Sequence, residues 1–431
     1  MAATVFVTDG EQRPALAIVR SLARRGLSVI VGADRAVSLA STSKYCARHV
    51  TYPPPSTDRE AFTRFLVDLV TREKIDVVLP VTDITTHAVC ASQEALRPWT
   101  ALAVPSLEAF DLVSNKWTLV ERASLCGVPV PRTVYLQDAT GLRAIAERIE
   151  YPAVVKPVRS RIRSGNGWTP TSVHYARSKA ELERLYRELE YLAAWPSLIQ
   201  QRIVGPGAGV FLLFDRGQPI ADFAHRRLRE KPPAGGVSVL CESVPVDSRL
   251  RQHAVRLLGG LGWHGIAMVE FKQDAATGDF FLMEVNGRFW GSLQLAIDAG
   301  VDFPALVCDL AHGRRPEAPP VYRRGVKSRW LFGDLDHLLL RLFKSDDDLR
   351  LPASAPSRWR TLADVLTCSG RDLRYEILSA DDRRPFQHEC VQNFRALAAS
   401  AITRVRRLVA GAGRLDRRPA GVYSKVPASG N

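Results

Sequence analysis

The most informative part of this sequence is the stretch Met283-Glu284-Val285-Asn286-Gly287-Arg288, together with Glu270-Phe271 before it. Side chains alternate between the two faces of a strand, so Glu284 and Asn286 point the same way. A tight turn between the two segments would pair them as strands and bring Glu270 onto that face. Two carboxylates and an amide oxygen gathered in this way form a hard-oxygen site suited to magnesium. A surface hairpin with solvated acids is the alternative interpretation.

Two arginines are the candidate catalytic residues. Arg288, two positions beyond Asn286, can hold an anionic intermediate through a pair of hydrogen bonds. The basic segment 225–238 is typical of a strand that ends in a proline- and glycine-containing loop. On that strand Arg227 and Arg229 alternate to one face and suit a carboxylate or acyl phosphate, and we favour Arg229. A solvated basic hairpin is the alternative for this segment.

The front of the chain alternates short apolar runs with amphipathic helical segments. Strands are expected at residues 4–7, 28–31, 49–52 and 75–81, and helices at 13–25, 59–73 and 84–96. Strands that alternate with helices of this length predict a parallel sheet with crossover helices. The turn Thr8-Asp9-Gly10 lacks the Gly-x-Gly-x-x-Gly pattern, so we expect a plain strand-to-helix turn rather than a dinucleotide site.

Four further motifs precede the carboxylates in a definite order: Ser114-Asn115-Lys116, Val154-Val155-Lys156-Pro157, Ser164-Gly165-Asn166-Gly167 and Leu198-Ile199-Gln200-Gln201-Arg202-Ile203. With Glu270 and Glu284-x-Asn286-x-Arg288, this ordered set resembles the ATP-grasp superfamily, and the resemblance covers roughly residues 1–313. A lysine on a strand beside a glycine-containing loop supplies positive charge and backbone N–H groups to phosphates, which agrees with that resemblance.

The resemblance implies a role for each motif. The nucleotide phosphates would contact Lys116 and Lys156, and the loop that folds over the triphosphate would contain Ser164, Gly165 and Gly167. Adenine would lie against a hinge formed by Gln200, Gln201, Arg202 and Ile203. The metal ligands would be Glu270, Glu284 and Asn286. The implied cofactors are ATP and Mg²⁺, as two ions that Mn²⁺ can replace.

The hinge departs from the family pattern. The family usually carries acidic residues near the adenine and the ribose, whereas this chain has no carboxylate from Gln200 to Phe214. Backbone groups at Gln201 to Ile203 can still read adenine. A ribose contact by a hinge carboxylate is therefore not expected here.

The resemblance implies an α/β fold in three parts. A pre-ATP-grasp domain with a parallel sheet would span residues 1–113. A two-lobed α+β ATP-grasp core would span 114–317, with a small lobe at about 118–200 and a large lobe at about 201–317. A mostly helical extension, ending in a frayed tail, would span 318–431.

The implied activity is that of an ADP-producing carbon–nitrogen ligase. It would activate a small-molecule carboxylate as an acyl phosphate with Mg-ATP and join it to an amine or related nucleophile. One alternative is a carbamoyl-phosphate- or carboxylase-type enzyme that uses bicarbonate. Another is a non-catalytic nucleotide-binding protein whose basic C-terminal region binds anionic surfaces. A homodimer is a further expectation, since many relatives in the superfamily are dimers.

Composition and charge limit the kinds of partner and the cellular location that we expect. The 431 residues carry a net charge of +14, and residues 321–431 contribute 21 basic and 12 acidic side chains. No basic and aromatic stacking motif accompanies this charge, so no nucleic-acid partner is expected. The basic helix expected at 391–409 should pack its apolar face against the core, which makes peripheral membrane contact the less favoured alternative. Seven scattered cysteines and no signal-like N-terminus indicate a cytoplasmic protein.

Overall fold

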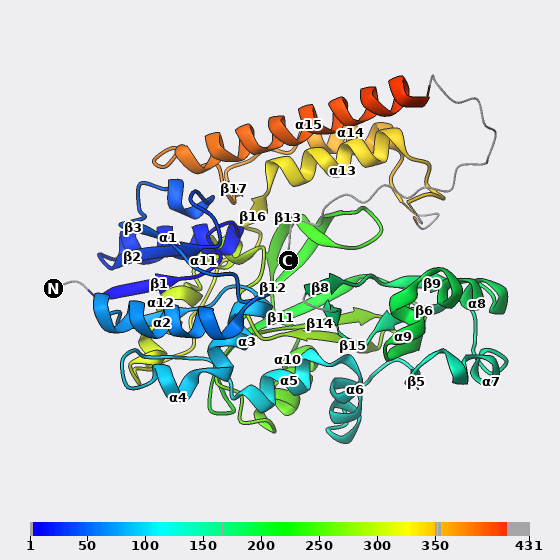
Figure 1. The fold of residues 1–431 in the computed structure, drawn as a ribbon, viewed down its shortest axis with the longest axis horizontal. Coiled ribbons are helices and arrows are strands. Elements are labelled where there is room, and N and C mark those ends of the chain that lie inside the picture. The colour runs from blue at the N-terminus through cyan, green and yellow to red at the C-terminus, as the bar shows by residue number, and fades with distance from the viewer. Residues whose placement is uncertain (1–2, 160, 165–166, 350, 352–354, 412–431) are drawn as a thin grey trace.

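The computed structural model describes residues 3–159, 161–164, 167–349, 351 and 355–411 (Figure 1). The first unit is a four-stranded sheet whose strands are parallel, as predicted, and lie in the order β3-β2-β1-β4. Its strands are β1 (Thr4–Val7), β2 (Ser28–Ala33), β3 (Arg48–Thr51) and β4 (Val77–Leu79). The connecting helices are α1 (Arg13–Arg24), η1 (Ala40–Thr42), α2 (Arg59–Glu73), α3 (Asp83–Ala91) and α4 (Gln93–Leu96). The single helix expected at 84–96 is thus two, which meet at Ser92.

A small lobe follows the helices α5 (Leu107–Ser114) and α6 (Lys116–Leu125). Its antiparallel sheet has the order β5-β10-β6-β9, built from β5 (Thr133–Leu136), β6 (Ala153–Pro157), β9 (His174–Ala176) and β10 (Ser197–Gln201). The helical elements η2 (Ala139–Gly141), α7 (Leu142–Ala146), α8 (Lys179–Glu188) and α9 (Glu190–Ala194) accompany it. Buried residues such as Val155, Leu182 and Ile199 give this lobe an apolar core of its own. A separate hairpin consists of β7 (Arg161–Ser164) and β8 (Gly167–Pro170).

The large lobe is a seven-stranded sheet in the order β15-β14-β11-β12-β13-β16-β17. Its strands are β11 (Gly207–Asp215), β12 (Gln218–Lys231), β13 (Val237–Val244), β14 (Gly265–Gln273), β15 (Phe280–Asn286), β16 (Lys327–Arg329) and β17 (Leu373–Tyr375). The helices α10 (Ser248–Gly259), α11 (Leu293–Ala299) and α12 (Phe303–Ala311) belong to the same lobe. Leu16 and Ile18 of α1 share one apolar cluster with Trp290 and Phe303, so the N-terminal unit and the large lobe have a common core.

The C-terminal extension is part of this architecture rather than an appendage. Strands β16 and β17 continue the large-lobe sheet, β16 antiparallel to β13 and β17 parallel to β16. A domain boundary after residue 317 therefore cuts through a sheet. The extension is also tied to the N-terminal unit, because Arg20 pairs with Asp382 at 2.9 Å and both side chains are almost fully buried.

Three helices form a layer at the top of Figure 1: α13 (Leu331–Phe343), α14 (Arg358–Leu366) and α15 (Arg384–Gly411). The first turns of α15 are anchored, because Trp330 Nε1 donates to Glu389 Oε1 at 2.7 Å and Phe386 packs near Phe332. Farther along, Phe394 and Leu397 are 69% and 64% exposed. The expectation that the apolar face of this helix is buried is wrong for these residues, because the helix continues beyond its anchoring contacts.

Candidate active site

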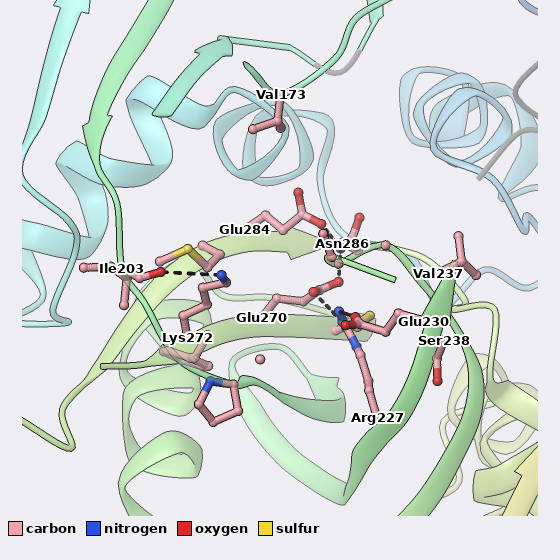
Figure 2. A pocket seen from close by; sticks show the side chains of 18 of the residues that line it. Val173, Ile203, Arg227, Glu230, Val237, Ser238, Glu270, Lys272, Glu284 and Asn286 are labelled. Carbon is pink, nitrogen blue, oxygen red and sulfur yellow. Dashed lines mark hydrogen bonds and ion pairs between the residues drawn. The ribbon is translucent and has the colours of Figure 1, made fainter. Parts of the chain in front are cut away.

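The strand pair β14–β15 brings the expected oxygen donors together. Glu270 lies directly opposite Glu284, and Asn286 lies opposite Met268. Asn286 Nδ2 donates to Glu284 Oε1 at 3.2 Å and to Glu270 Oε1 at 3.5 Å. Figure 2 shows the three side chains at the centre of the pocket. Glu270 thus faces Glu284 and Asn286 as inferred, but this pairing depends on a register shift between Glu270 and Phe271, because strict alternation from the turn would place Met283 opposite Glu270.

The pKa values of the two carboxylates are shifted in opposite directions. Burial raises the pKa of Glu270, and the facing Glu284 raises it further against the opposing charge of Arg227. Burial also acts to raise the pKa of Glu284, but Lys116, the Asn286 amide and Lys156 outweigh it and lower that pKa. Two buried carboxylates side by side repel each other, so the pair is well suited to a cation that both can share.

Two lysines from the preceding segments face Glu284. Lys116 is the first residue of α6, and the Asn115 side chain caps that helix by accepting from Trp117 N at 2.9 Å. Lys156 lies on β6 opposite Leu198 of β10. Burial lowers the pKa of Lys156 to about 8, against the attraction of Glu284. Burial lowers the pKa of Lys116 as well, again opposed by Glu284, so both lysines are held as partly desolvated cations beside the carboxylates.

The segment after β10 forms one end of the same pocket. Gln200, Gln201, Arg202 and Ile203 all line it. Gln200 is 5% exposed and its Nε2 donates to Thr133 Oγ1 at 2.8 Å, so this side chain has a structural partner within the small lobe. Lys272 Nζ donates to the Ile203 carbonyl at 3.5 Å. Within the described part of the chain, this end of the pocket presents backbone groups and cations.

Of the glycine-containing motif, Ser164 ends β7 and Gly167 begins β8. Ser164 pairs with Gly167 at the closed end of the hairpin β7–β8. Gly165 lies outside the described residues.

Arg227 and Arg229 do not share a face, which corrects the expectation from strand alternation. The pairing of β12 with β13 shifts between Arg227 and Arg229 and again before Glu230, so bulges break the alternation. Arg229 Nε and Nη2 donate to the buried Asp334 at 2.5 and 2.7 Å, and Arg229 is not among the residues that line the pocket. The preference for Arg229 as the catalytic arginine therefore has no geometric support.

Arg227 is the arginine that reaches the carboxylates. Its Nη2 donates to Glu270 Oε2, and its Nη1 donates to Glu230 Oε1 at 3.1 Å. Strand β11 lies between β12 and β14, and its residue opposite Glu270 is Gly209. A Cβ atom at Gly207 would lie 3.9 Å from Arg227 Nη1. This distance is ordinary van der Waals contact, so the Arg227 side chain passes beside Gly207 as it crosses β11 to Glu270.

Arg288 is fixed where the pocket meets the N-terminal unit. Its Nη2 donates to Asn286 Oδ1 at 3.3 Å, and its Nε donates to Asp83 Oδ2 at 3.2 Å. Asp83 is the first residue of α3, so the N-terminal unit orients this guanidinium. Sequence reasoning missed Asp83, Lys272 and Glu230. Of these, only Lys272 had a simple signal, since it stands two residues after Glu270 on the same strand.

A cavity of about 640 Å³ lies between the two lobes. Its charged lining residues are Lys156, Arg202, Arg227, Glu230, Lys231, Glu270, Lys272, Glu284 and Arg288. No group of three or more His, Cys, Asp and Glu side chains that could hold a metal occurs among the described residues. A metal ion at this pair would therefore need further oxygen ligands from the Asn286 amide and from a bound phosphate.

Comparisons with known proteins agree with this arrangement. Residues 198–333 match the family described as "ATP-grasp in the biosynthetic pathway with Ter operon". The D-alanine–D-alanine ligase of Neisseria meningitidis serogroup B is 27% identical over 169 residues, which are 37% of this chain and 52% of that protein. The chain thus spans about half the length of this curated relative.

Solved structures with the same fold extend the likeness beyond that region. Biotin carboxylase from Campylobacter jejuni superposes with a TM-score of 0.59 at 17% identity, covering 74% of this chain and 72% of that chain. L-amino acid ligase from Bacillus licheniformis superposes with a TM-score of 0.54 at 18% identity, covering 74% and 75%. The family match places residues 198–333 in an ATP-grasp family, and the sequence relative and the shared fold agree with that assignment.

Proposed function

We propose that this protein is an ATP-dependent ligase that activates a carboxylate as an acyl phosphate and joins it to an amine or related nucleophile. One observation carries the proposal. Glu270 and Glu284 lie opposite each other on the large lobe, Lys156 lines the cavity that they share, and the charges of Lys116 and Lys156 both act on Glu284. Paired carboxylates facing paired lysines match the charge pattern of a metal–triphosphate complex.

The donor set fits magnesium. Mg²⁺ favours one or two carboxylates together with substrate phosphate oxygens, and Glu270, Glu284 and the Asn286 amide oxygen provide that set. When bound, the ion would neutralise charge on the transferred phosphoryl group. Two ions, exchangeable with Mn²⁺, belong to the same proposal.

The chain's own residues account for the remaining requirements of phosphoryl transfer. Lys116 and Lys156 neutralise the nucleotide phosphates, and adenine lies against the backbone of Gln201 to Ile203. A substrate carboxylate oxygen attacks the γ-phosphorus, and the bond from phosphorus to the ADP oxygen breaks. Arg227 and Arg288, which both line the cavity, stabilise the resulting acyl phosphate. The amine nitrogen then bonds to the acyl carbon, and inorganic phosphate leaves.

Measurement of Mg²⁺-dependent phosphate release from ATP tests this proposal. The purified protein is assayed against pools of amino acids and other carboxylates, each with and without amines, beside Glu284→Ala. Asp309→Asn is a matched control, because Asp309 pairs with Arg314 on the surface of the large lobe. We expect release that requires a particular pool and Glu284. Release with bicarbonate alone would favour the carboxylase-type alternative, and ATP binding without turnover on any pool would favour a non-catalytic nucleotide-binding protein.

A cytoplasmic location is proposed on the cysteines. All seven are free thiols, as expected in a reducing compartment. In the described part of the chain no helix has the length and hydropathy needed to cross a bilayer. Homodimerisation stays a prediction.

A further inference from the structure

The loop between β12 and β13 forms one wall of the cavity. Pro232, Ala234, Gly235 and Gly236 line it, with Lys231 and Val237 at the two ends of the loop. Figure 2 shows Val237 and Ser238 beside Glu230, on the side of the pocket away from Ile203 and Lys272. The wall is therefore separate from the hinge, and it borders the region around Arg227 where the acyl phosphate would form.

Helix α13 holds the strand end that leads into this loop. His337 Nδ1 lies 2.7 Å from the Glu230 carbonyl oxygen, and Lys231 Nζ is ion-paired with Asp336. At the start of α13, Trp330 N donates to the Val239 carbonyl at 2.8 Å, just after the loop. Both ends of the loop are thus attached to the same helix.

A buried ion cluster fixes α13 itself. Asp334 is fully buried, and its two oxygens accept from Arg229 of β12 and from Arg329 of β16. A buried carboxylate shared by two guanidiniums has a narrow range of favourable positions, because displacement leaves charges unpaired out of water. Asp334 therefore fixes the position of α13 relative to the sheet.

The ion pair between Lys231 and Asp336 is partly exposed, unlike the buried cluster around Asp334. Its side chains are 32% and 39% exposed, and an ion pair at that exposure adds little to the stability of the whole fold. Lys231 nevertheless lines the cavity. Replacement of one partner of this ion pair should therefore leave the protein folded. The structural change should be confined to the loop.

We propose that α13, a helix beyond the motifs of the nucleotide site, is a positioning element for the second substrate. Asp336 and His337 hold the loop 232–236 in the place where it contacts the carboxylate or amine substrate rather than ATP. The identity of what the loop contacts rests on the proposed function. The position of the loop does not depend on it.

The test compares Asp336→Asn with Asp309→Asn, which cuts an ion pair of similar exposure on α12. Hydrogen–deuterium exchange of the full chain without substrate is read out over residues 231–238. In Asp336→Asn we expect exchange in this segment to become about 5-fold faster, the factor that corresponds to losing one exposed pair. Exchange elsewhere and the thermal midpoint should stay unchanged, Asp336→Glu should restore protection, and Asp309→Asn should not alter the segment. Unchanged exchange in Asp336→Asn, or a rise spread over the chain, would overturn the proposal.

Kinetics then assign the role to one substrate. With the substrates found by the phosphate-release assay, Asp336→Asn should raise KM for the carboxylate or amine about 3- to 10-fold and leave KM for ATP within about twofold. An equal rise in both KM values would contradict a role confined to the second substrate. If no pool supports turnover, the proposed function fails, but the exchange measurement still decides whether α13 holds the loop.

Discussion

Replacement of Lys156 by methionine should weaken nucleotide binding and stabilise the empty protein. Burial lowers the pKa of Lys156 from 10.5 to about 8. Each unit of such a shift corresponds to about 1.4 kcal/mol, so keeping the ammonium charged in the empty pocket costs at most about 3 kcal/mol. Solvent screening in a pocket open to water reduces this cost to about 1–2 kcal/mol. A bound triphosphate would offset it, whereas in the ligand-free protein the attraction of Glu284 offsets it only in part.

The sign of the pH dependence follows from the same shift. Between about pH 8 and 10.5 the unfolded lysine holds a proton that the folded one has lost, so stability of the wild-type protein rises over that range relative to the variant. We therefore expect Lys156→Met to be more stable than wild type at pH 7, by about 1–2 kcal/mol, and the difference to shrink towards pH 10. Chemical denaturation at several pH values measures it.

Nucleotide affinity is measured on the same preparations by titration calorimetry with Mg-ATP. Loss of a charge-assisted contact to phosphate in a desolvated site should weaken binding by about 10- to 100-fold. A Lys156→Met protein that is less stable than wild type at pH 7, or that binds Mg-ATP equally well, would refute the reasoning. The first result would mean that Lys156 serves the fold by neutralising Glu284, and the second that Lys156 does not contact the nucleotide.

Two further predictions separate structural from functional charges. Arg227→Ala should lower kcat/KM by about 100-fold or more, since Arg227 lies in the pocket. It should cost less stability than Arg229→Ala, because its partner Glu270 is 20% exposed and lines a cavity that water can enter. Arg229→Ala should cost about 3–5 kcal/mol of stability because it leaves the fully buried Asp334 with one partner fewer. Steady-state kinetics and urea denaturation distinguish the two, and equal effects would contradict the assignment of Arg227 to the site. Burial raises the pKa of Glu389 from 4.5 to about 7, so its contribution to stability is complete below about pH 4.5 and is lost as the pH rises through about 7. Glu389→Gln keeps an acceptor for Trp330 Nε1 and should remove up to about 3 kcal/mol of that loss of stability. The thermal midpoint of the variant should then vary less with pH than that of the wild type. An unchanged profile would show that Glu389 does not titrate in this range.

Part of the site could be predicted from strand geometry. Glu284 and Asn286 share a face because side chains alternate along β15. The parallel strands of the N-terminal sheet follow from its alternation of strands and helices in the same way. Glu270 lies opposite Glu284 only because the register shifts by one residue between Glu270 and Phe271, which local periodicity does not indicate.

The features that sequence reasoning missed depend on contacts between distant residues or on irregular strands. A register shift between Arg227 and Arg229 places the two side chains on different faces of β12, and nothing in the composition of the segment marks it. The partner of Arg229 is Asp334, which lies in the extension to which the sequence assigned no role. The exposure of Phe394 likewise depends on where the anchoring contacts of α15 end, which an amphipathic pattern does not record.

The central claim is that Glu270, Glu284 and Asn286 hold a metal–triphosphate complex against Lys116 and Lys156. Titration calorimetry of ATP into the wild-type protein and into Glu284→Ala, each with Mg²⁺ and with EDTA, tests it most directly. We expect ATP binding by the wild type to require Mg²⁺, and Glu284→Ala to lose about 100-fold or more in affinity under the same conditions. ATP binding that is indifferent to Mg²⁺, or equal in the two proteins, would contradict it.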